Sequence, residues 1–311
     1  MKKLHIKTPL LESAVLSKLT GKKIYLKLEN TQPSFSFKIR GIGLLCQRAV
    51  EEGKSEFVSS SGGNAGFAAA YAGKMLGVKT TVFVPTTTPQ DTIDKIKQLE
   101  AEVLVKGEVW DETDKFARAF ADKVNGLYIS PFDHPLIWQG HASMIDEIAE
   151  EIDKPDAIIL SVGGGGLLCG VVEGLHRNNW QDVTVIATET YGAASFHEAQ
   201  KAGKLITLDK IDSIAKSLGA KTVSAQTLEW NKKHEIKSVL VSDKQTIVAC
   251  ENFANHHRFL VEPACGASLS VVYDQNEVLK NAETVVVIVC GGIGVDMQKM
   301  DEWKKIVYNH S

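Results

Sequence analysis

The sequence predicts an α/β protein built on parallel sheets, and three observations support this prediction. Short apolar runs alternate along the chain with amphipathic stretches of helical length, which is the pattern of strand-helix-strand units. Four consecutive glycines, Gly163 to Gly166, separate the apolar run Ala157–Val162 from such a stretch. With 311 residues the chain exceeds the usual limit for one hydrophobic core, so we expect two lobes, each with an open twisted sheet.

Strands are expected where short apolar runs are bounded by polar or turn-forming residues, and helices where apolar residues recur with helical spacing. The expected strands are Lys23–Leu28, Ser55–Ser59, Thr80–Val84, Glu102–Lys106, Leu127–Ile129, Ala157–Val162, Val183–Thr188 and Thr284–Cys290. The expected helices are Phe37–Glu52, Asn64–Leu76, Pro89–Leu99, Glu108–Lys123, Ile137–Ile152, Leu167–Arg177, Asp243–His256 and Ala267–Leu279.

A boundary between the lobes is expected near Ser130–Pro135, where two prolines interrupt the alternation. The sequence then predicts a small lobe at residues 37–134 and a large lobe at residues 1–36 and 135–311. Because parallel strands present ligands at their carboxyl ends, we expect a ligand in the cleft between the lobes.

Composition excludes several classes of protein. The net charge is -3, with 35 basic and 38 acidic residues and no long block of one sign, which argues against nucleic-acid and acidic-membrane partners. The five cysteines are scattered without a Cys-x-x-Cys pair, so neither a zinc site nor a disulfide scaffold is indicated. The N-terminus has no uninterrupted apolar core, and no segment reaches the ~18 to 20 apolar residues of a membrane span. We expect a soluble, uncleaved, cytoplasmic protein.

Two features indicate an enzyme that holds pyridoxal phosphate on a lysine. A lysine amine acts as a covalent nucleophile, and Lys38 lies in the distinctive run Gln32–Gly41. The glycine run Gly163–Gly166 could present backbone N–H groups to a phosphate, whereas a plain turn needs only one or two glycines. Taken alone, a lysine that follows an aromatic residue is usually a surface lysine.

Several motifs occur together, in one order, over nearly the whole chain: Tyr25–Leu28, Ser60–Gly66, Pro135–Ser143, Leu160–Gly170, Val261–Gly266 and Val289–Gly292, besides the lysine segment. In these motifs the chain resembles the serine/threonine dehydratase family of fold type II pyridoxal-phosphate enzymes, which includes the short L-serine dehydratases and L-threonine deaminases. The resemblance implies the architecture of the tryptophan synthase β subunit. It also implies that the large lobe binds the cofactor and that the small lobe carries Lys38 and a loop for the substrate carboxylate.

The resemblance implies roles for residues of the small lobe. Lys38 would form the internal Schiff base and then remove the Cα proton of the substrate. Phe37 would pack against the pyridine ring, and Asn64 would form a hydrogen bond to the ring hydroxyl. The substrate carboxylate would be bound by a loop that leads into a helix, where exposed N–H groups favour an anion. The residues of this loop are Ser61, Gly62, Gly63, Asn64 and Ala65.

In the large lobe the resemblance implies a phosphate loop and a thiol at the pyridine nitrogen. The phosphate loop would consist of Gly163, Gly164, Gly165, Gly166 and Leu167. Cys290 would face the ring nitrogen, and an ordinary thiol, mostly protonated at neutral pH, would donate only a weak hydrogen bond. A weak partner makes the ring a modest electron sink, which suits β-elimination better than transamination. Outside this context, Cys290 would be interpreted as a small buried hydrophobic residue.

Glu189 allows a second interpretation, because it follows the glycine run at the distance of the ribose-binding acid in dinucleotide folds. The dinucleotide motif nevertheless fails, since its last glycine would fall on Leu168 or Cys169. By resemblance, Glu189 instead belongs to a site for a monovalent cation such as K⁺. The other ligands would be carbonyl groups of Gly163, Ala193, Leu218 and Ala220 and the hydroxyl of Ser195. An ordinary helix-end or surface glutamate remains the alternative.

The sequence departs from the family at Phe35, where a glycine is usual, and a positive φ there would strain phenylalanine. We expect α,β-elimination of L-serine, and more slowly of L-threonine, to the 2-oxo acid and ammonia, in a homodimer. One alternative is a serine racemase, with Ser61 as its second acid/base. Others are a β-replacing enzyme, against which Ile39 argues because such enzymes tend to have aspartate there, and a non-catalytic relative that binds the cofactor or an amino acid.

Overall fold

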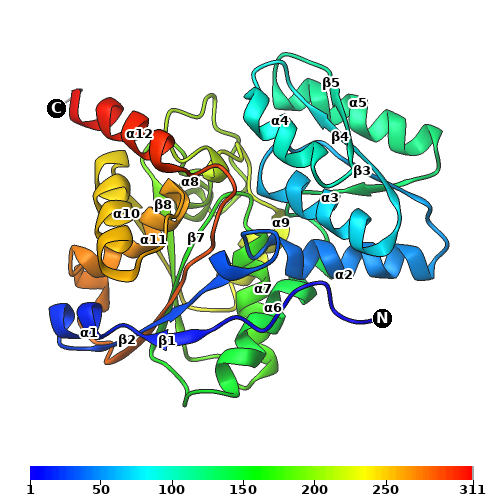
Figure 1. The fold of residues 1–311 in the computed structure, drawn as a ribbon. Coiled ribbons are helices and arrows are strands. Elements are labelled where there is room, and N and C mark those ends of the chain that lie inside the picture. Colours follow the sequence, from blue (N-terminus) through cyan, green and yellow to red (C-terminus); the bar gives the residue numbers. More distant parts are fainter. Residues whose placement is uncertain (310–311) are drawn as a thin grey trace. The chain divides into compact units, whose positions relative to one another are not determined.

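The computed structural model describes residues 1–309 and confirms the α/β class with parallel sheets (Figure 1). The chain divides into two compact units. The first unit comprises Met1–Ile6 and Gln32–His141, and the second comprises Lys7–Thr31 and the chain from Ala142 onward. The sequence placed residues 1–6, 32–36 and 135–141 in the large lobe, whereas here they belong to the first unit. Among residues 1–309, no helix is both long and apolar enough to span a membrane.

The first unit contains a four-stranded parallel sheet in the order β5-β4-β3-β6. Its strands are β3 (Glu56–Ser59), β4 (Lys79–Val84), β5 (Glu102–Val105) and β6 (Leu127–Ile129), and its helices are α2 (Lys38–Glu51), α3 (Asn64–Leu76), α4 (Gln90–Lys97) and α5 (Trp110–Lys123). Successive residues of β3 enter different core clusters. Phe57 packs with α2 and α3, and Val58 packs with Ala117 and Ala121 of α5. Both faces of the sheet are therefore covered, which explains why its strands are continuous apolar runs.

The second unit contains a six-stranded sheet in the order β1-β2-β10-β7-β8-β9, parallel except for β1. Its strands are β1 (Leu10–Glu12), β2 (Lys23–Lys27), β7 (Ala157–Ser161), β8 (Thr184–Thr190), β9 (Ile236–Val241) and β10 (Thr284–Ile288). Its helices are α1 (Ala14–Thr20), α7 (Gly166–Arg177), α8 (Ser195–Ala202), α9 (Ala225–Asn231), α10 (Asp243–His257), α11 (Pro263–Tyr273) and α12 (Met297–Asn309), with short 3₁₀ turns η1 (Glu29–Thr31), η2 (Lys216–Leu218) and η3 (Glu277–Leu279). The chain passes from the first unit to the second for the last time after His141, inside α6 (Pro135–Ala149).

The expected helix Ala267–Leu279 was wrong in both bounds. The helix α11 begins at Pro263, because proline is accepted in the first turn, where its missing N–H has no intrahelical partner. It ends at Tyr273, and Gln275 adopts a positive φ of 49°, which a continuing helix does not allow. The segment Glu277–Leu279 is a separate 3₁₀ turn. The strand expected to reach Cys290 also ends earlier, at Ile288.

Several elements had no sequence prediction: β1, α1, α8, α9, β9 and α12. The strand β9 lies at the edge of its sheet, and several of its residues are only partly buried. Its sequence Ile-Lys-Ser-Val-Leu-Val therefore lacks the continuous apolar character that marks the central strands β7 and β10.

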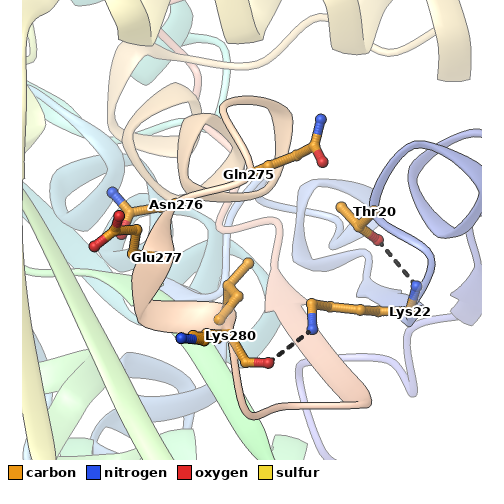
Figure 2. A pocket seen from close by; sticks show the side chains of 7 residues that line it. Thr20, Lys22, Gln275, Asn276, Glu277 and Lys280 are labelled. Carbon is orange, nitrogen blue, oxygen red and sulfur yellow. Dashed lines mark hydrogen bonds between the residues drawn. The ribbon is translucent and has the colours of Figure 1, made fainter.

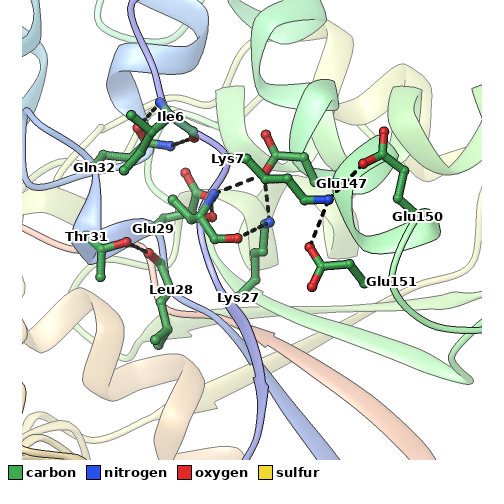
Figure 3. Close-up of polar contacts among 11 residues, drawn as sticks. Ile6, Lys7, Lys27, Leu28, Glu29, Thr31, Gln32, Glu147, Glu150 and Glu151 are labelled. Carbon is green, nitrogen blue, oxygen red and sulfur yellow. Dashed lines mark hydrogen bonds and ion pairs between the residues drawn. The ribbon is translucent and has the colours of Figure 1, made fainter.

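A buried ion pair joins β2 to α6 in the second unit (Figure 3). The Lys27 Nζ atom lies 2.7 Å from the Glu147 carboxylate and donates to the Thr8 carbonyl at 2.8 Å. The Thr8 hydroxyl donates to Glu29 at 2.6 Å. Lys27 and Glu29 are fully buried and Glu147 nearly so, so each charge depends on polar contacts inside the protein.

We predict that Lys27→Met lowers the free energy of unfolding by about 3 kcal/mol, because it leaves the Glu147 carboxylate buried without its cationic partner. Chemical denaturation of the purified protein measures this change. The matched control is Lys7→Met, which removes an exposed pair with Glu150 in the same region and should change stability little. Equal effects of the two substitutions would contradict the prediction.

Candidate functional site

The turn before Lys38 has a positive φ at Phe35, which is the conformation expected to strain phenylalanine. Phe35 adopts φ +59°, and its N–H donates to the Gln32 carbonyl at 2.7 Å. A positive φ is uncommon for a bulky residue, so the position does favour glycine. The Phe35 ring is 53% exposed and lies 5.9 Å, centroid to centroid, from the ring of Phe67 on α3. An aromatic contact thus ties the turn to the helix behind it.

Lys38 is the first residue of α2 and is half-buried. Its Nζ atom donates to the Pro131 carbonyl at 2.5 Å and lies 5.2 Å from the centroid of the Phe37 ring. Pro131 follows β6, so the carboxyl end of that strand fixes the position of the amine. The lysine and the phenylalanine that the sequence assigned to the cofactor therefore lie side by side.

His141 packs its ring edge-on against Phe37, with a centroid distance of 4.8 Å. Its side chain is fully buried, and among residues 1–309 neither ring nitrogen has a hydrogen-bond partner. Burial, together with the charges of Lys38 and Arg40, holds the pKa of His141 well below its usual value. The imidazole is therefore neutral and supports the Phe37 ring by packing. No role was predicted for His141 from the sequence.

The expected carboxylate loop runs from the end of β3 into α3. Ser61 Oγ accepts a hydrogen bond from the Gly63 N–H at 3.2 Å, so the hydroxyl folds back onto its own loop. Gly63 occupies the N-cap position and Asn64 is the first helical residue, so Asn64 is not the helix cap. A Cβ at Gly66 would lie 1.7 Å from the Ser61 carbonyl oxygen, so only glycine allows this close approach.

The start of α3 has the helix-end geometry that favours an anion. The helix begins with the hydrogen bond from Phe67 N–H to the Gly63 carbonyl, 3.0 Å long. The helical geometry leaves the preceding N–H groups without partners inside the helix, and the helix dipole places partial positive charge there. A carboxylate is the type of group that this helix end favours.

The glycine run forms the turn between β7 and α7. Gly165 is the N-cap of α7 with φ +89°, and a Cβ there would lie 1.9 Å from Thr227 Oγ1. A Cβ at Gly163 would lie 2.9 Å from the Ser217 carbonyl oxygen. Both positions therefore require glycine to bring the turn this close to its neighbours. The first helical bond runs from Cys169 N–H to the Gly165 carbonyl, so the N–H groups before it lie at a helix end of the kind that favours an anion.

Cys290 lies two residues beyond β10 and belongs to a group of buried sulfur and hydroxyl atoms. Its Sγ atom is 3.1 Å from Cys265 Sγ and 3.8 Å from Ser161 Oγ. The N–H of Gly291 donates to Cys265 Sγ at 3.1 Å. Burial, and then the contact with Cys290, raises the pKa of Cys265 well above its usual value. All five cysteines of the chain are buried free thiols.

Glu262 supports the segment that follows Cys290. Its carboxylate accepts hydrogen bonds from Gly294 N–H at 2.8 Å and from Ser217 Oγ at 2.9 Å. A Cβ at Gly292 would lie 2.0 Å from the Glu262 carboxyl carbon. Sequence analysis recognised Glu262 and Cys265 only as parts of a motif and gave neither residue a role.

Glu189 is fully buried inside β8 rather than on the surface. Its two carboxylate oxygens accept hydrogen bonds from Phe196 N–H at 2.8 Å and His197 N–H at 2.7 Å. Burial raises the pKa of Glu189 to about 8, although these two hydrogen bonds act in the opposite direction. Ser195 Oγ, at the start of α8, is also buried and has no hydrogen-bond partner among residues 1–309.

The remaining expected cation ligands are main-chain carbonyls. Gly163 packs against η2, and a Cβ at this position would lie 3.2 Å from Leu218 Cα. The Leu218 carbonyl accepts a hydrogen bond from Ala220 N–H at 3.0 Å, and Ala193 bridges to Thr190 at the end of β8. No group of three or more His, Cys, Asp or Glu side chains among residues 1–309 is placed to hold a metal ion.

A pocket of about 380 Å³ lies on the second unit and contains none of the expected site residues (Figure 2). It is lined by Thr20, Lys22, Gln275, Asn276, Glu277, Leu279 and Lys280. The Lys22 ammonium donates to the Ala282 carbonyl at 2.6 Å, so the lysine links the segment after α1 to the segment that follows η3.

The residues of each unit are compatible with pyridoxal phosphate. The first unit provides a half-buried amine next to an aromatic ring and a helix end suited to a carboxylate. The second unit provides a turn in which only glycine fits sterically and which leads into a helix, as in phosphate sites. It also provides a buried thiol.

Comparison with known proteins places the chain in a family. A family model described as pyridoxal-phosphate dependent enzyme matches residues 1–291. The human protein named L-serine dehydratase/L-threonine deaminase is 50% identical over 312 aligned residues, which cover 97% of this chain and 95% of the human protein. A solved fungal L-serine ammonia-lyase from Rhizomucor miehei is 38% identical, with a TM-score of 0.94 over 98% of this chain and 99% of that one. Threonine deaminase isoform 2 from Solanum lycopersicum, in its processed form, is 28% identical, with a TM-score of 0.90 over 98% and 84% of the two chains. The chain belongs to the family of pyridoxal-phosphate dependent enzymes.

Proposed function

We propose that this enzyme eliminates ammonia from L-serine to give pyruvate and, more slowly, from L-threonine to give 2-oxobutanoate. The observation that carries the proposal is the half-buried Lys38 amine, held at the Pro131 carbonyl within the unit that also contains the carboxylate loop. The substrates follow from the name of the human relative, which is half identical over nearly the whole chain. Pyridoxal phosphate, when bound, supplies an aldehyde that links to amines and a ring that withdraws electrons from the substrate Cα.

The first unit would bind the substrate and move its proton. Lys38 Nζ would hold the cofactor covalently and, once released from it, accept the Cα proton. Phe37 would pack against the ring, and its contact with the neutral His141 would limit its motion. The loop from Ser61 to Ala65 would orient the substrate carboxylate, and Asn64 would form a hydrogen bond to the ring hydroxyl.

The second unit would hold the phosphate and a monovalent cation. The residues Gly163 to Leu167 would bind the phosphate at the start of α7. Cys290 would donate a weak hydrogen bond to the ring nitrogen. We further propose that K⁺ binds Glu189, the Ser195 hydroxyl and the carbonyls of Gly163, Ala193, Leu218 and Ala220. The buried carboxyl group with a raised pKa and the unpartnered buried hydroxyl support this part of the proposal.

Racemisation of serine is the second candidate activity, because Ser61 could act as acid/base on the opposite face of the substrate. The Ser61 oxygen accepts from Gly63 N–H, yet its own proton can still be donated. Incubation with L-serine separates the candidates: pyruvate marks elimination, D-serine marks racemisation, and neither product marks a non-catalytic relative. We also propose, from the family resemblance, a cytoplasmic homodimer, and sedimentation equilibrium measures its state of association.

We expect Lys38→Ala to lose covalent cofactor attachment and to lower pyruvate formation at least on the order of 10³-fold, about 4 kcal/mol, because the positioned base is lost. Borohydride reduction followed by mass analysis measures the attachment, and a coupled pyruvate assay measures turnover. The control is Lys54→Ala, which removes another lysine of the same unit, bound to Asn125, and should retain both properties. Retention of reducible cofactor and normal turnover in Lys38→Ala would refute the assignment.

We expect Phe35→Gly to raise kcat/KM for L-threonine relative to L-serine while cofactor attachment stays intact. One methyl group changes discrimination by ~1 to 3 kcal/mol, so removal of a ring from the turn that precedes Lys38 can alter the preference. The control is Glu100→Gly, which relieves a similar positive φ of 65° elsewhere in the same unit. If Phe35→Gly changes only the thermal midpoint, as Glu100→Gly should, the ring does not limit substrate access.

The cation proposal predicts a specific dependence on pH. Because burial raises the pKa of Glu189 to about 8, the folded chain binds more protons there than the unfolded chain does. Stability in potassium-free buffer should therefore fall as the pH rises toward and through about 8, and K⁺ should offset the loss by pairing with the carboxylate. Thermal melts with and without KCl measure the effect, which should be larger at high pH. If Glu189→Gln shows the same K⁺ effect as the wild type, Glu189 is not a ligand.

A further inference from the structure

We propose that Asp114 is a positioning residue for the carboxylate loop and that it acts through Ser60. The inference rests on the proposed function, since it concerns how that loop binds the substrate carboxylate. Ser60 follows β3 and directly precedes Ser61, so the position of Ser60 determines where the loop begins. All the residues involved belong to the first unit.

Side chains from two further elements meet at the Ser60 hydroxyl. Ser60 is fully buried, and its Oγ atom donates to Asp114 Oδ1 on α5 at 2.7 Å. The Tyr128 hydroxyl, on β6, lies 3.1 Å from Ser60 Oγ and donates to the same Asp114 oxygen. Arg118, one turn further along α5, donates to Asp114 Oδ2 at 2.7 Å. Asp114 on α5 thus connects this helix and β6 to Ser60, the residue directly before the loop.

The charges in this cluster keep it intact over a wide pH range. Burial alone would raise the pKa of Asp114, but hydrogen bonds from Tyr128, Arg118 and Ser60 bring it below its usual value. Burial and the bond to Asp114 raise the pKa of Tyr128, so its hydroxyl stays protonated as a donor. The Arg118 guanidinium also lies over the Tyr128 ring, 4.0 Å from the centroid. A carboxylate with three donors is more fixed than a single neutral hydrogen bond would be.

This arrangement differs from an ordinary helix-surface ion pair. The Arg118–Asp114 pair at spacing i,i+4 would by itself stabilise only α5. The second contact of Asp114, to a buried hydroxyl before the loop, transmits the position of α5 to the backbone of Ser61. Loss of that contact should therefore weaken carboxylate binding, while the chemical steps at Lys38 continue.

The experiment measures Asp114→Asn, Ser60→Ala and the double variant as holoenzymes. We expect KM for L-serine to rise about tenfold in each, equivalent to ~1.4 kcal/mol, with kcat within about twofold of wild type. The double variant should show no larger KM than the single variants, because both remove one connection. Hydrogen exchange of the amides at 61–66 should become faster in all three.

Thr113→Val is the matched control. Thr113 neighbours Asp114 on α5, is fully buried, and donates to the Lys106 carbonyl at 2.7 Å, away from the loop. This variant should lower stability and leave both KM and loop exchange unchanged. If exchange at 61–66 stays at the wild-type rate in Asp114→Asn, or if KM effects of the two single variants add, the proposal is overturned. If the wild type forms no pyruvate, the proposed function fails, whereas the exchange measurement still decides whether Asp114 anchors the loop.

Discussion

The parallel pairing of β3 with β6 is the constraint on which the first unit depends. Ser59 pairs with Ile129 at the ends of these strands, so the chain leaves both strands at the same edge of the sheet. From β3 it continues into the carboxylate loop, and from β6 it continues to Pro131, whose carbonyl holds the Lys38 amine. One strand pair therefore positions both the proposed carboxylate site and the proposed nucleophile, Lys38. A register slip of one residue would exchange the faces of Phe57 and Val58, which pack in different core clusters, so the packing of β3 also fixes the site.

The same principle operates separately in the second unit. The strands β10, β7 and β8 are neighbours, and all three run parallel. Cys290 follows β10, and the glycine turn follows β7. Glu189 lies near the end of β8, in the next-to-last residue pair with β9. The 3.8 Å separation of Ser161 Oγ from Cys290 Sγ is a direct result of the β7–β10 pairing. The polar groups of this unit gather at one sheet edge because the strands that carry them share a direction.

The candidate site features that the sequence predicts are those that depend on local chemistry. Lys38, the loop beginning at Ser61 and the glycine run were recognised because glycines and reactive side chains at strand ends are local signals. The contacts between distant residues could not be found in this way. Cys265 lies 25 residues from Cys290, and Asp114 lies 54 residues from Ser60, so only the fold brings each pair together. Elements with weak patterns, such as the edge strand β9, were missed for a related reason: burial, which creates the pattern, is incomplete there.

Two buried carboxylates illustrate why burial of a charge can indicate function. Glu147 is paired with Lys27 at 2.7 Å, so its burial is balanced inside the protein and serves the packing of β2 against α6. Glu189 is equally buried, but the hydrogen bonds that it accepts come from main-chain N–H groups of Phe196 and His197, and its pKa rises to about 8. The amide oxygen of a glutamine could accept a hydrogen bond at this helix start without the cost of desolvating a charge. A bound cation would balance the charge of a carboxylate at this position. The Ser195 hydroxyl, nearby in the chain and without a hydrogen-bond partner among residues 1–309, is an oxygen of the kind that a hard cation prefers.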